Sequence, residues 1–382
     1  MNYRQFGKLD WQVSALGFGA MRLPTLDNDS GKIDETLAIH MIRTAIDAGV
    51  NYVDTAYGYH RGTSEVLVGK ALKDGYREKV CLATKMPSWL VKTPEDLDRL
   101  LDEQLTRLDT NKIDFYLLHA LNAEYWKNYQ SMNVFDWAER KMAEGKFDHL
   151  GFSFHDEFSV FVDILNGYEQ WDFCQIQYNY MDTDYQAGIK GLELAAEKGL
   201  GVIVMEPLRG GNLAKSPAPA LVQEAFARSA HDWQPAEWAL QWVWDQPQVS
   251  LALSGMSTLE QVQQNLVSAS RSGVGTFSTQ DHALLDNVRQ AYHALVPIPC
   301  TACEYCLPCP SDVAIPSVFT IYNEAIMYDA PGHGRWAYAD NIKAENRADN
   351  CVECGLCEEA CPQQIEIINW LKIADTYLTA KE

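Results

Sequence analysis

Eight of the ten cysteines in this 382-residue chain lie in two short groups near its C-terminus. The first group consists of Cys300, Cys303, Cys306 and Cys309, and the second consists of Cys351, Cys354, Cys357 and Cys361. A proline directly follows the last cysteine of each group. Short spacing lets successive thiolates converge on one metal centre, which a disulfide framework does not require. The two groups therefore predict metal binding.

The second group has the spacing CxxCxxCxxxCP of bacterial ferredoxins, in which the fourth cysteine binds the other cluster of a pair. The first group is one residue shorter before its last cysteine. If the exchange holds, we expect two [4Fe–4S] clusters. One would be held by Cys300, Cys303, Cys306 and Cys361, and the other by Cys309, Cys351, Cys354 and Cys357. The alternatives are one cluster with a degenerate first group, or two structural zinc ions, which the Cys-Pro after each triplet disfavours.

A second set of residues has the types needed for acid–base chemistry. Asp54, Lys85 and His119 each directly follow a short apolar run, and Tyr59 lies five residues after Asp54. A phenol with its usual pKa of about 10 is a poor proton donor at neutral pH, and a nearby ammonium lowers that pKa. Asp54 would hold the Lys85 ammonium, and His119 would hydrogen-bond a substrate oxygen as negative charge develops there. The set predicts hydride addition to a carbonyl, with Tyr59 as the proton donor.

The elements that must position these residues alternate between apolar runs and amphipathic helical segments. The eight runs are residues 14–18, 50–53, 80–84, 113–118, 149–152, 173–177, 201–204 and 248–253. Such alternation implies parallel strands with right-handed crossovers, and eight units can close into a (β/α)8 TIM barrel, an α/β fold whose chemistry lies at the C-terminal strand ends. A doubly wound open sheet is the alternative, but the GxGxxG turn that usually marks it is missing after the first run.

A change of composition marks a domain boundary near residue 296, where Pro297 and Pro299 precede the first cysteine. We expect the barrel to comprise residues 1–295 and a small ferredoxin-like iron–sulfur domain to comprise residues 296–382. The first nine residues are expected to form a short hairpin that plugs the barrel floor. Trp89 and Trp126, in the segments after the third and fourth runs, are candidate walls of a substrate pocket.

The barrel resembles the aldo-keto reductase family. The stretch VDTAYGY at residues 53–59, followed by GTSEVLVG at residues 62–69, matches the family segment DTAxxY…GxSExxxG. Lys85 after Ala83-Thr84 and His119 after Leu117-Leu118 match the rest of the family's catalytic tetrad. The resemblance implies NAD(P)H-dependent reduction of an aldehyde or ketone, or oxidation of the matching alcohol. The C-terminal tail resembles that of a subgroup with a ferredoxin-like domain.

The resemblance also implies residues that bind the cofactor. Ser153 and Gln175 match residues that hold the nicotinamide amide, and Met205 stands where an aromatic residue commonly stacks on the nicotinamide ring. The other implied contacts are Gly19, Met21, Asp54, Pro207, Leu208, Gly210, Gly211, Gly255, Gln261, Gln264 and Asn265. Relatives that prefer NADPH often carry a cation where Gly255 and Gln261 stand, because a 2′-phosphate needs a cationic partner. These two uncharged residues favour NADH.

Charge and hydropathy exclude several classes of protein. The formal net charge of −21 opposes binding to phosphate backbones, and no basic stripe offsets it, so no nucleic acid is expected. No apolar run approaches the ~18 residues of a membrane span, and the first residues lack a secretory signal. We therefore expect a cytoplasmic protein. Residues 300–382 carry 13 acidic and five basic side chains, which suits an electron partner with a basic face, although structural clusters need none.

Three functions are consistent with these observations. The first is an NAD(P)H-linked carbonyl reductase or alcohol dehydrogenase that carries iron–sulfur clusters and acts on a small-molecule substrate. The second is an electron-transfer enzyme that links nicotinamide to a ferredoxin-type partner. The third is a redox sensor that binds nicotinamide with little turnover, which the complete tetrad disfavours.

Overall fold

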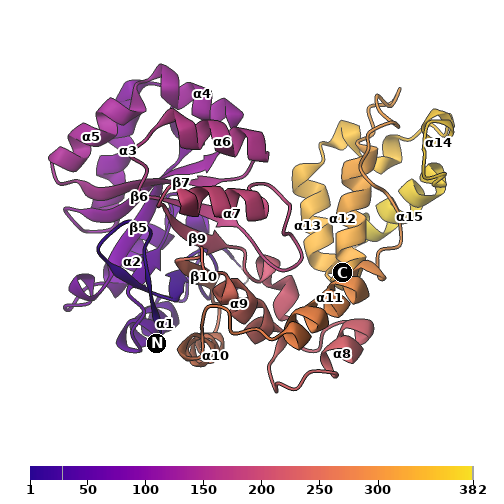
Figure 1. Ribbon diagram of the computed structural model, residues 1–382. Helices are drawn as coiled ribbons and strands as arrows, with labels where there is room; N and C mark the ends of the chain where they lie inside the picture. Colours follow the sequence, from indigo (N-terminus) through magenta and orange to yellow (C-terminus); the bar gives the residue numbers. More distant parts are fainter. Residues whose placement is uncertain (28, 381–382) are drawn as a thin grey trace. The chain divides into compact units, whose positions relative to one another are not determined.

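The computed structural model describes residues 1–27 and 29–380 and is shown in Figure 1. The chain forms two compact units, one made of Met1–Gly211 with Trp233–Phe277 and the other of Asn212–Asp232 with Ser278–Glu382. The predicted boundary at residue 296 assigns residues 212–232 and 278–295 to the barrel domain. These segments instead group with the second unit, where their helices α8 (Ala220–Phe226) and α11 (Thr279–His293) pack against each other. The position of the domain boundary stays a prediction.

The first unit contains a closed barrel of eight parallel strands in the order β10-β3-β4-β5-β6-β7-β8-β9. The strands are β3 (Leu16–Gly19), β4 (Tyr52–Asp54), β5 (Cys81–Met86), β6 (Ile113–Leu121), β7 (Phe147–Phe154), β8 (Phe173–Gln177), β9 (Gly201–Met205) and β10 (Leu251–Gly255). Each corresponds to one of the eight predicted runs. The TIM barrel is therefore confirmed, and the open-sheet alternative is wrong.

Amphipathic helices follow the strands along the chain of the first unit. They are α1 (Glu35–Asp47), α2 (Ser64–Ala71), α3 (Pro94–Arg107), α4 (Ala123–Ser131), α5 (Val134–Ala143), α6 (Phe158–Gly167), α7 (Gly188–Glu197), α9 (Pro235–Asp245) and α10 (Leu259–Ser270). Helix α3 begins at a capping box formed by Thr93 and Asp96. Its leucines at four helically spaced positions are buried, which is the pattern of a helix with one face against a core.

An N-terminal hairpin closes the floor of the barrel, but it extends to Ser14, beyond the nine residues predicted for it. Strands β1 (Tyr3–Gln5) and β2 (Gln12–Ser14) pair in antiparallel fashion, and the fully buried Phe6 between them belongs to the barrel core. The Phe6 ring lies 5.1 Å from the Phe115 ring and 6.0 Å from the Phe173 ring. A side chain at Gly201 would meet Phe6 at 2.2 Å, so only glycine allows this close packing.

The second unit is helical. It contains α8 (Ala220–Phe226), α11 (Thr279–His293), α12 (Ile315–Met327), α13 (Pro331–Asn341), α14 (Leu356–Glu359) and α15 (Ile367–Thr379). Buried apolar side chains of α12 and α15, including Phe319 and Leu371, form its core. The first cysteine group precedes α12, and the second lies between α13 and α15. Over the ranges 1–27 and 29–380, no helix combines the length and apolar character needed to cross a membrane.

Candidate functional site

The four tetrad residues lie together at the C-terminal end of the barrel strands. Asp54 ends β4, Lys85 and His119 lie in β5 and β6, and Tyr59 begins the short 3-10 helix that follows β4. The Lys85 Nζ donates hydrogen bonds to Asp54 Oδ1 at 2.5 Å and to Tyr59 Oη at 3.3 Å. The His119 ring meets the Tyr59 ring edge to face, with the ring centroids 6.1 Å apart. Parallel strands therefore deliver these residues to one rim, where they can act on one substrate atom.

Burial controls the protonation states in this cluster. It raises the pKa of the Tyr59 phenol, although the Lys85 ammonium opposes the shift. We expect from the sequence that Lys85 brings the pKa of Tyr59 below its usual value. This expectation is wrong, because the effect of desolvation is larger than the opposite effect of the Lys85 ammonium. Burial disfavours the charge on Lys85, but Asp54 and Tyr59 outweigh it and raise the pKa of Lys85. Burial and the nearby Lys85 hold the pKa of His119 well below its usual value. At neutral pH the site holds a protonated phenol, an ammonium and a neutral imidazole.

Two tetrad atoms have unused hydrogen-bonding capacity. Asp54 Oδ2 and His119 Nδ1 are buried and have no hydrogen-bond partner among the described residues. The backbone oxygen of His119 accepts a hydrogen bond from Ser88 Oγ at 2.5 Å, which fixes the segment that carries the ring. A buried polar atom without a partner is costly and marks either a stored strain or a ligand contact. Because both atoms lie at the rim of the barrel, a contact with a bound ligand would account for them.

Behind Lys85 lies a buried polar network that the sequence reasoning missed. The fully buried Glu65 accepts hydrogen bonds from Thr84 Oγ1 and Gln104 Nε2, both at 2.7 Å. Gln104 Nε2 also lies 3.0 Å from the Lys85 carbonyl oxygen, to which it donates. Arg107 pairs with Glu65 at 3.3 Å. The network fixes the β5 backbone and thereby the direction of the Lys85 side chain.

The residues implied to hold the nicotinamide come from β7, β8 and β9, which follow the tetrad strands in the order of the barrel. Ser153 on β7 and Gln175 on β8 are adjacent in register, and both are 2% exposed. Gln175 Oε1 has no hydrogen-bond partner among the described residues, whereas Ser153 Oγ accepts one from the Ala120 amide at 2.7 Å. Met205, at the end of β9, pairs in register with Gln177. A buried amide oxygen without a partner fits the carboxamide of a nicotinamide, which has N–H groups to donate.

The segments that follow β9 and β10 carry the implied phosphate and adenosine contacts. Gly210 and Gly211 both have positive φ, and no atom lies within 4 Å of where a Gly211 Cβ would stand. The Gly211 amide donates to the Leu208 carbonyl oxygen at 2.9 Å, so the turn offers an anion close approach to its backbone rather than a free Gly211 N–H. At the start of helix α10, Gln261 is exposed and its Oε1 accepts a hydrogen bond from the Ser257 amide at 2.8 Å. The remaining positions differ in exposure: Gly19, Pro207 and Asn265 are buried, Leu208 is half-buried, and Met21, Gly255 and Gln264 are exposed.

Arg22 is a cation in this region that the sequence reasoning did not identify. Its side chain lies 3.2 Å from the position that a Gly255 Cβ would take and 3.4 Å from that of Gly210. Its guanidinium pairs with Glu206 at 3.6 Å. Gly255 itself is uncharged, but the Arg22 side chain borders it from the segment after β3. No motif could have revealed this, because Arg22 follows β3 and Gly255 ends β10, and these two strands meet only when the barrel closes.

The two candidate pocket walls have different environments. The ring of Trp89 lies 5.1 Å from the His119 ring and is 36% exposed, so it borders the rim. Trp126 is 6% exposed, lies in helix α4 and packs against Phe135, with centroids 5.7 Å apart. The expectation for Trp126 is wrong because its helix turns the ring inward against the small residue Gly167.

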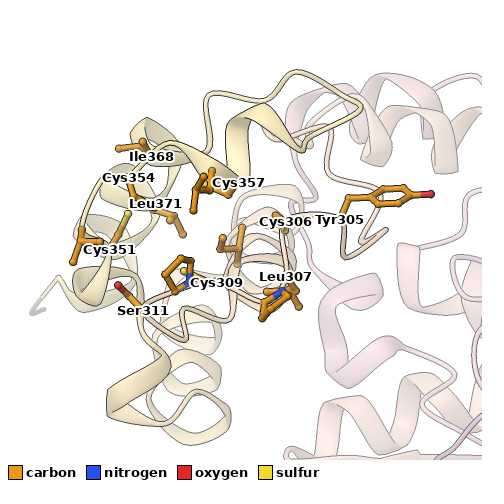
Figure 2. A pocket seen from close by; sticks show the side chains of 15 residues that line it. Tyr305, Cys306, Leu307, Cys309, Ser311, Cys351, Cys354, Cys357, Ile368 and Leu371 are labelled. Atoms are coloured by element: carbon orange, nitrogen blue, oxygen red, sulfur yellow. The ribbon is translucent and has the colours of Figure 1, made fainter.

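The cysteines of the second unit surround two cavities. The first cavity, shown in Figure 2, is lined by Cys309, Cys351, Cys354 and Cys357 and also by Cys306, which borders both cavities. The second cavity is lined by Cys300, Cys303, Cys306 and Cys361. Among the described residues, no three His, Cys, Asp or Glu side chains are placed to hold a single metal ion. The cysteines from the two groups instead meet in two mixed sets.

The chemistry of the donors suits iron–sulfur clusters. All ten cysteines are free, and burial raises the pKa of Cys306 and raises that of Cys357 to about 11. Both cavities also carry apolar side chains, among them Ile315, which borders the two. Sulfur donors in apolar surroundings fit a thiolate-ligated cluster, whose irons would stabilise the deprotonated form.

Comparison with protein families agrees with this arrangement. A model of the aldo/keto reductase family matches residues 15–290, and a model described as a 4Fe-4S dicluster domain matches residues 299–366. The chain belongs to the aldo/keto reductase family. It is an oxidoreductase of that family, with an iron–sulfur domain following the barrel.

Relatives of this aldo/keto reductase cover its barrel. The NADH-specific methylglyoxal reductase of Escherichia coli is 27% identical over 304 residues, which is 68% of this chain and 91% of that protein. The probable aldo-keto reductase 1 of Glycine max is 26% identical and covers 69% of this chain and 82% of its own length. Among solved structures, the holo form of aldo-keto reductase AKR11C1 from Bacillus halodurans has a TM-score of 0.62 at 25% identity, covering 75% of this chain and 96% of that one. A Klebsiella pneumoniae aldo-keto reductase in complex with NADPH has a TM-score of 0.61 at 25% identity, with 76% and 96% covered.

Proposed function

We propose that this enzyme reduces a small aldehyde or ketone with a reduced nicotinamide cofactor, and that Tyr59 donates the proton. The observation that carries the proposal is the hydrogen bond from the buried Lys85 ammonium to Tyr59, beside a neutral His119. Relatives in this family include a methylglyoxal reductase and a structure with NADPH bound. Both are consistent with carbonyl reduction by this chain.

A bound nicotinamide would supply the hydride. His119 would direct a ring N–H towards the carbonyl oxygen, since its imidazole is neutral and can donate one hydrogen bond. As charge develops on that oxygen, the Tyr59 phenol would transfer its proton, and Lys85 would stabilise the phenolate that remains. Asp54 would keep the Lys85 ammonium charged and in place. Gln175 and Ser153 would hold the nicotinamide amide at the rim, and the loop of Gly210 and Gly211 would receive the pyrophosphate.

A deuterium transfer experiment tests this proposal. Reduction of methylglyoxal and other small aldehydes with a nicotinamide deuterated at its reactive carbon should place deuterium on the former carbonyl carbon of the alcohol. Direct hydride transfer requires this outcome, because the hydride never exchanges with water. Product that carries only solvent hydrogen at that carbon would refute the proposal and would favour an electron-transfer route.

We expect this enzyme to prefer NADH over NADPH. Gly255 and Gln261 offer no charge to a 2′-phosphate, and a missing charge-assisted hydrogen bond costs roughly 1.5–3 kcal/mol. The Arg22 side chain borders Gly255, but its guanidinium is paired with Glu206. Steady-state kcat/KM with both cofactors measures the preference. A preference for NADPH that disappears in Arg22→Gln would contradict the expectation and assign the 2′-phosphate contact to Arg22.

We also expect an unusual pH profile for reduction. Because the pKa of Tyr59 is raised, the phenol stays protonated until the pH exceeds about 10, and kcat/KM for reduction should fall only above that point. Because the pKa of His119 is lowered, no change should appear near its usual value of about 6.5. Alcohol oxidation needs the phenolate and should rise with pH over the same alkaline range. A titration of the reduction rate with a midpoint near neutrality would contradict these assignments.

For the second unit, we propose two [4Fe–4S] clusters with exchanged fourth ligands. The support is the composition of the two cavities: Cys361 lies with the first cysteine group, and Cys309 lies with the second. A single cluster would leave four of the eight grouped cysteines without a role.

A further inference from the structure

Four exposed apolar side chains border the cavity formed by Cys309, Cys351, Cys354 and Cys357. They are Tyr305, Leu307, Val352 and Leu356, which we call the apolar collar, and their exposed fractions are 69%, 38%, 67% and 54%. Two come from the loop of the first cysteine group and two from that of the second. Figure 2 shows the Tyr305 ring pointing away from the surrounding cysteines. Even with a cluster in the cavity, the side chains of the apolar collar would stay exposed to water on their outer sides.

The cavity that the apolar collar borders is a point where electrons could enter or leave. Cys354 lines the cavity and is itself exposed, so a cluster held there would lie close to the surface. A purely structural cluster gains nothing from exposed apolar neighbours, since each adds to the cost of hydrating apolar surface. Grouped apolar side chains at a surface usually mark an interaction site. Their place beside the cysteines indicates that the partner approaches the cluster itself.

The charge of the same loops indicates the kind of partner. Glu304, Glu353 and Glu359 are exposed and lie within two residues of a cysteine. Residues 300–382 carry 13 acidic and five basic side chains, a formal charge of −8 to which thiolate-bound clusters add. Lys372, the basic residue paired with Glu353, compensates one of these acids. A partner with a basic rim would be attracted to this surface, whereas an acidic carrier would be repelled.

We propose that the apolar collar docks a one-electron carrier protein that has an apolar centre and a positively charged rim. The proposal rests on the clusters of the proposed function. A reduced cluster held by Cys309, Cys351, Cys354 and Cys357 would supply one electron to the carrier's oxidised centre, and no proton or bond would be exchanged. The acidic loops steer the carrier, and the collar holds it over Cys354.

Native and lysine-acetylated cytochrome c are suitable probes, because they share one haem but differ in surface charge. The protein is prepared anaerobically with its clusters, and iron and sulfide are counted first. Binding to the oxidised protein is measured by titration calorimetry, and electron transfer from the reduced protein by stopped flow. We expect native cytochrome c to bind and react at least about tenfold better than the acetylated form at low salt, with the advantage falling as salt rises.

Variants of the collar separate docking from charge alone. Tyr305→Ser and Val352→Ser should each weaken binding and slow the reaction about tenfold, as truncation of an interface anchor does. Val267→Ser is the matched control, because this valine is 50% exposed on helix α10, in the barrel unit. Full iron content with equal binding in the Val352 and Val267 variants would overturn the docking proposal and leave the clusters standing. Protein without iron would overturn the clusters of the proposed function, and this inference with them.

Discussion

Replacing Tyr59 with phenylalanine should lower the rate of carbonyl reduction by roughly 10²–10⁴-fold, the usual contribution of general acid catalysis. The phenol oxygen is the atom that meets the Lys85 ammonium, and the change removes only that oxygen. Because the implied nicotinamide contacts come from other strands, the dissociation constant for the cofactor should stay nearly constant. Single-turnover reduction and cofactor fluorescence titration measure the two quantities separately.

Tyr57 offers a matched control for this variant. Its hydroxyl donates to the Glu103 carboxylate at 3.1 Å rather than to the tetrad. Tyr57→Phe should therefore keep most of the reduction rate. If Tyr59→Phe also kept most of it, Tyr59 would not be the proton donor, and the alternative of a nicotinamide-binding sensor with little turnover would gain support.

The tetrad could be predicted from the sequence because of how parallel barrels are built. Asp54, Lys85 and His119 each follow an apolar run, and parallel strands must present those ends on one face. The network of Glu65 and Gln104 could not be predicted in this way. These two residues lie on helices, and which strand backbone they reach depends on how each helix packs against the barrel.

Other features could not be predicted from the sequence, because they depend on how the barrel closes or on a balance of opposing electrostatic effects. Arg22 reaches Gly255 because β3 and β10 are neighbours in the closed barrel, although they lie far apart in the chain. The direction of the Tyr59 pKa shift is a balance between burial and Lys85, and residue types alone do not give the degree of burial. Residues 212–232 group with the second unit because helix α8 packs against helix α11, and no local sequence pattern predicts this packing.

Anaerobically prepared protein should contain about eight iron and about eight sulfide per chain, because the cysteines supply two sets of four ligands. Cys361→Ser should lower both counts to about four. The lost cluster should be the one held by Cys300, Cys303 and Cys306, since Cys361 lines the cavity of these residues. Cys309→Ser should give the same counts by losing the other cluster, and Cys174→Ser, at a buried cysteine of the barrel, should keep all the iron.

Double variants decide which cluster each single change removes. Adding Cys303→Ser to Cys361→Ser should leave the iron count at about four, because both changes damage one cluster. Adding Cys354→Ser to Cys361→Ser should bring the count close to zero, because each change then damages a different cluster. The opposite pattern would show that each cysteine group binds its own cluster and that the exchange is wrong. Zinc in place of iron in the unmodified protein would refute the cluster assignment itself, and about four iron there would mean that only one cluster forms.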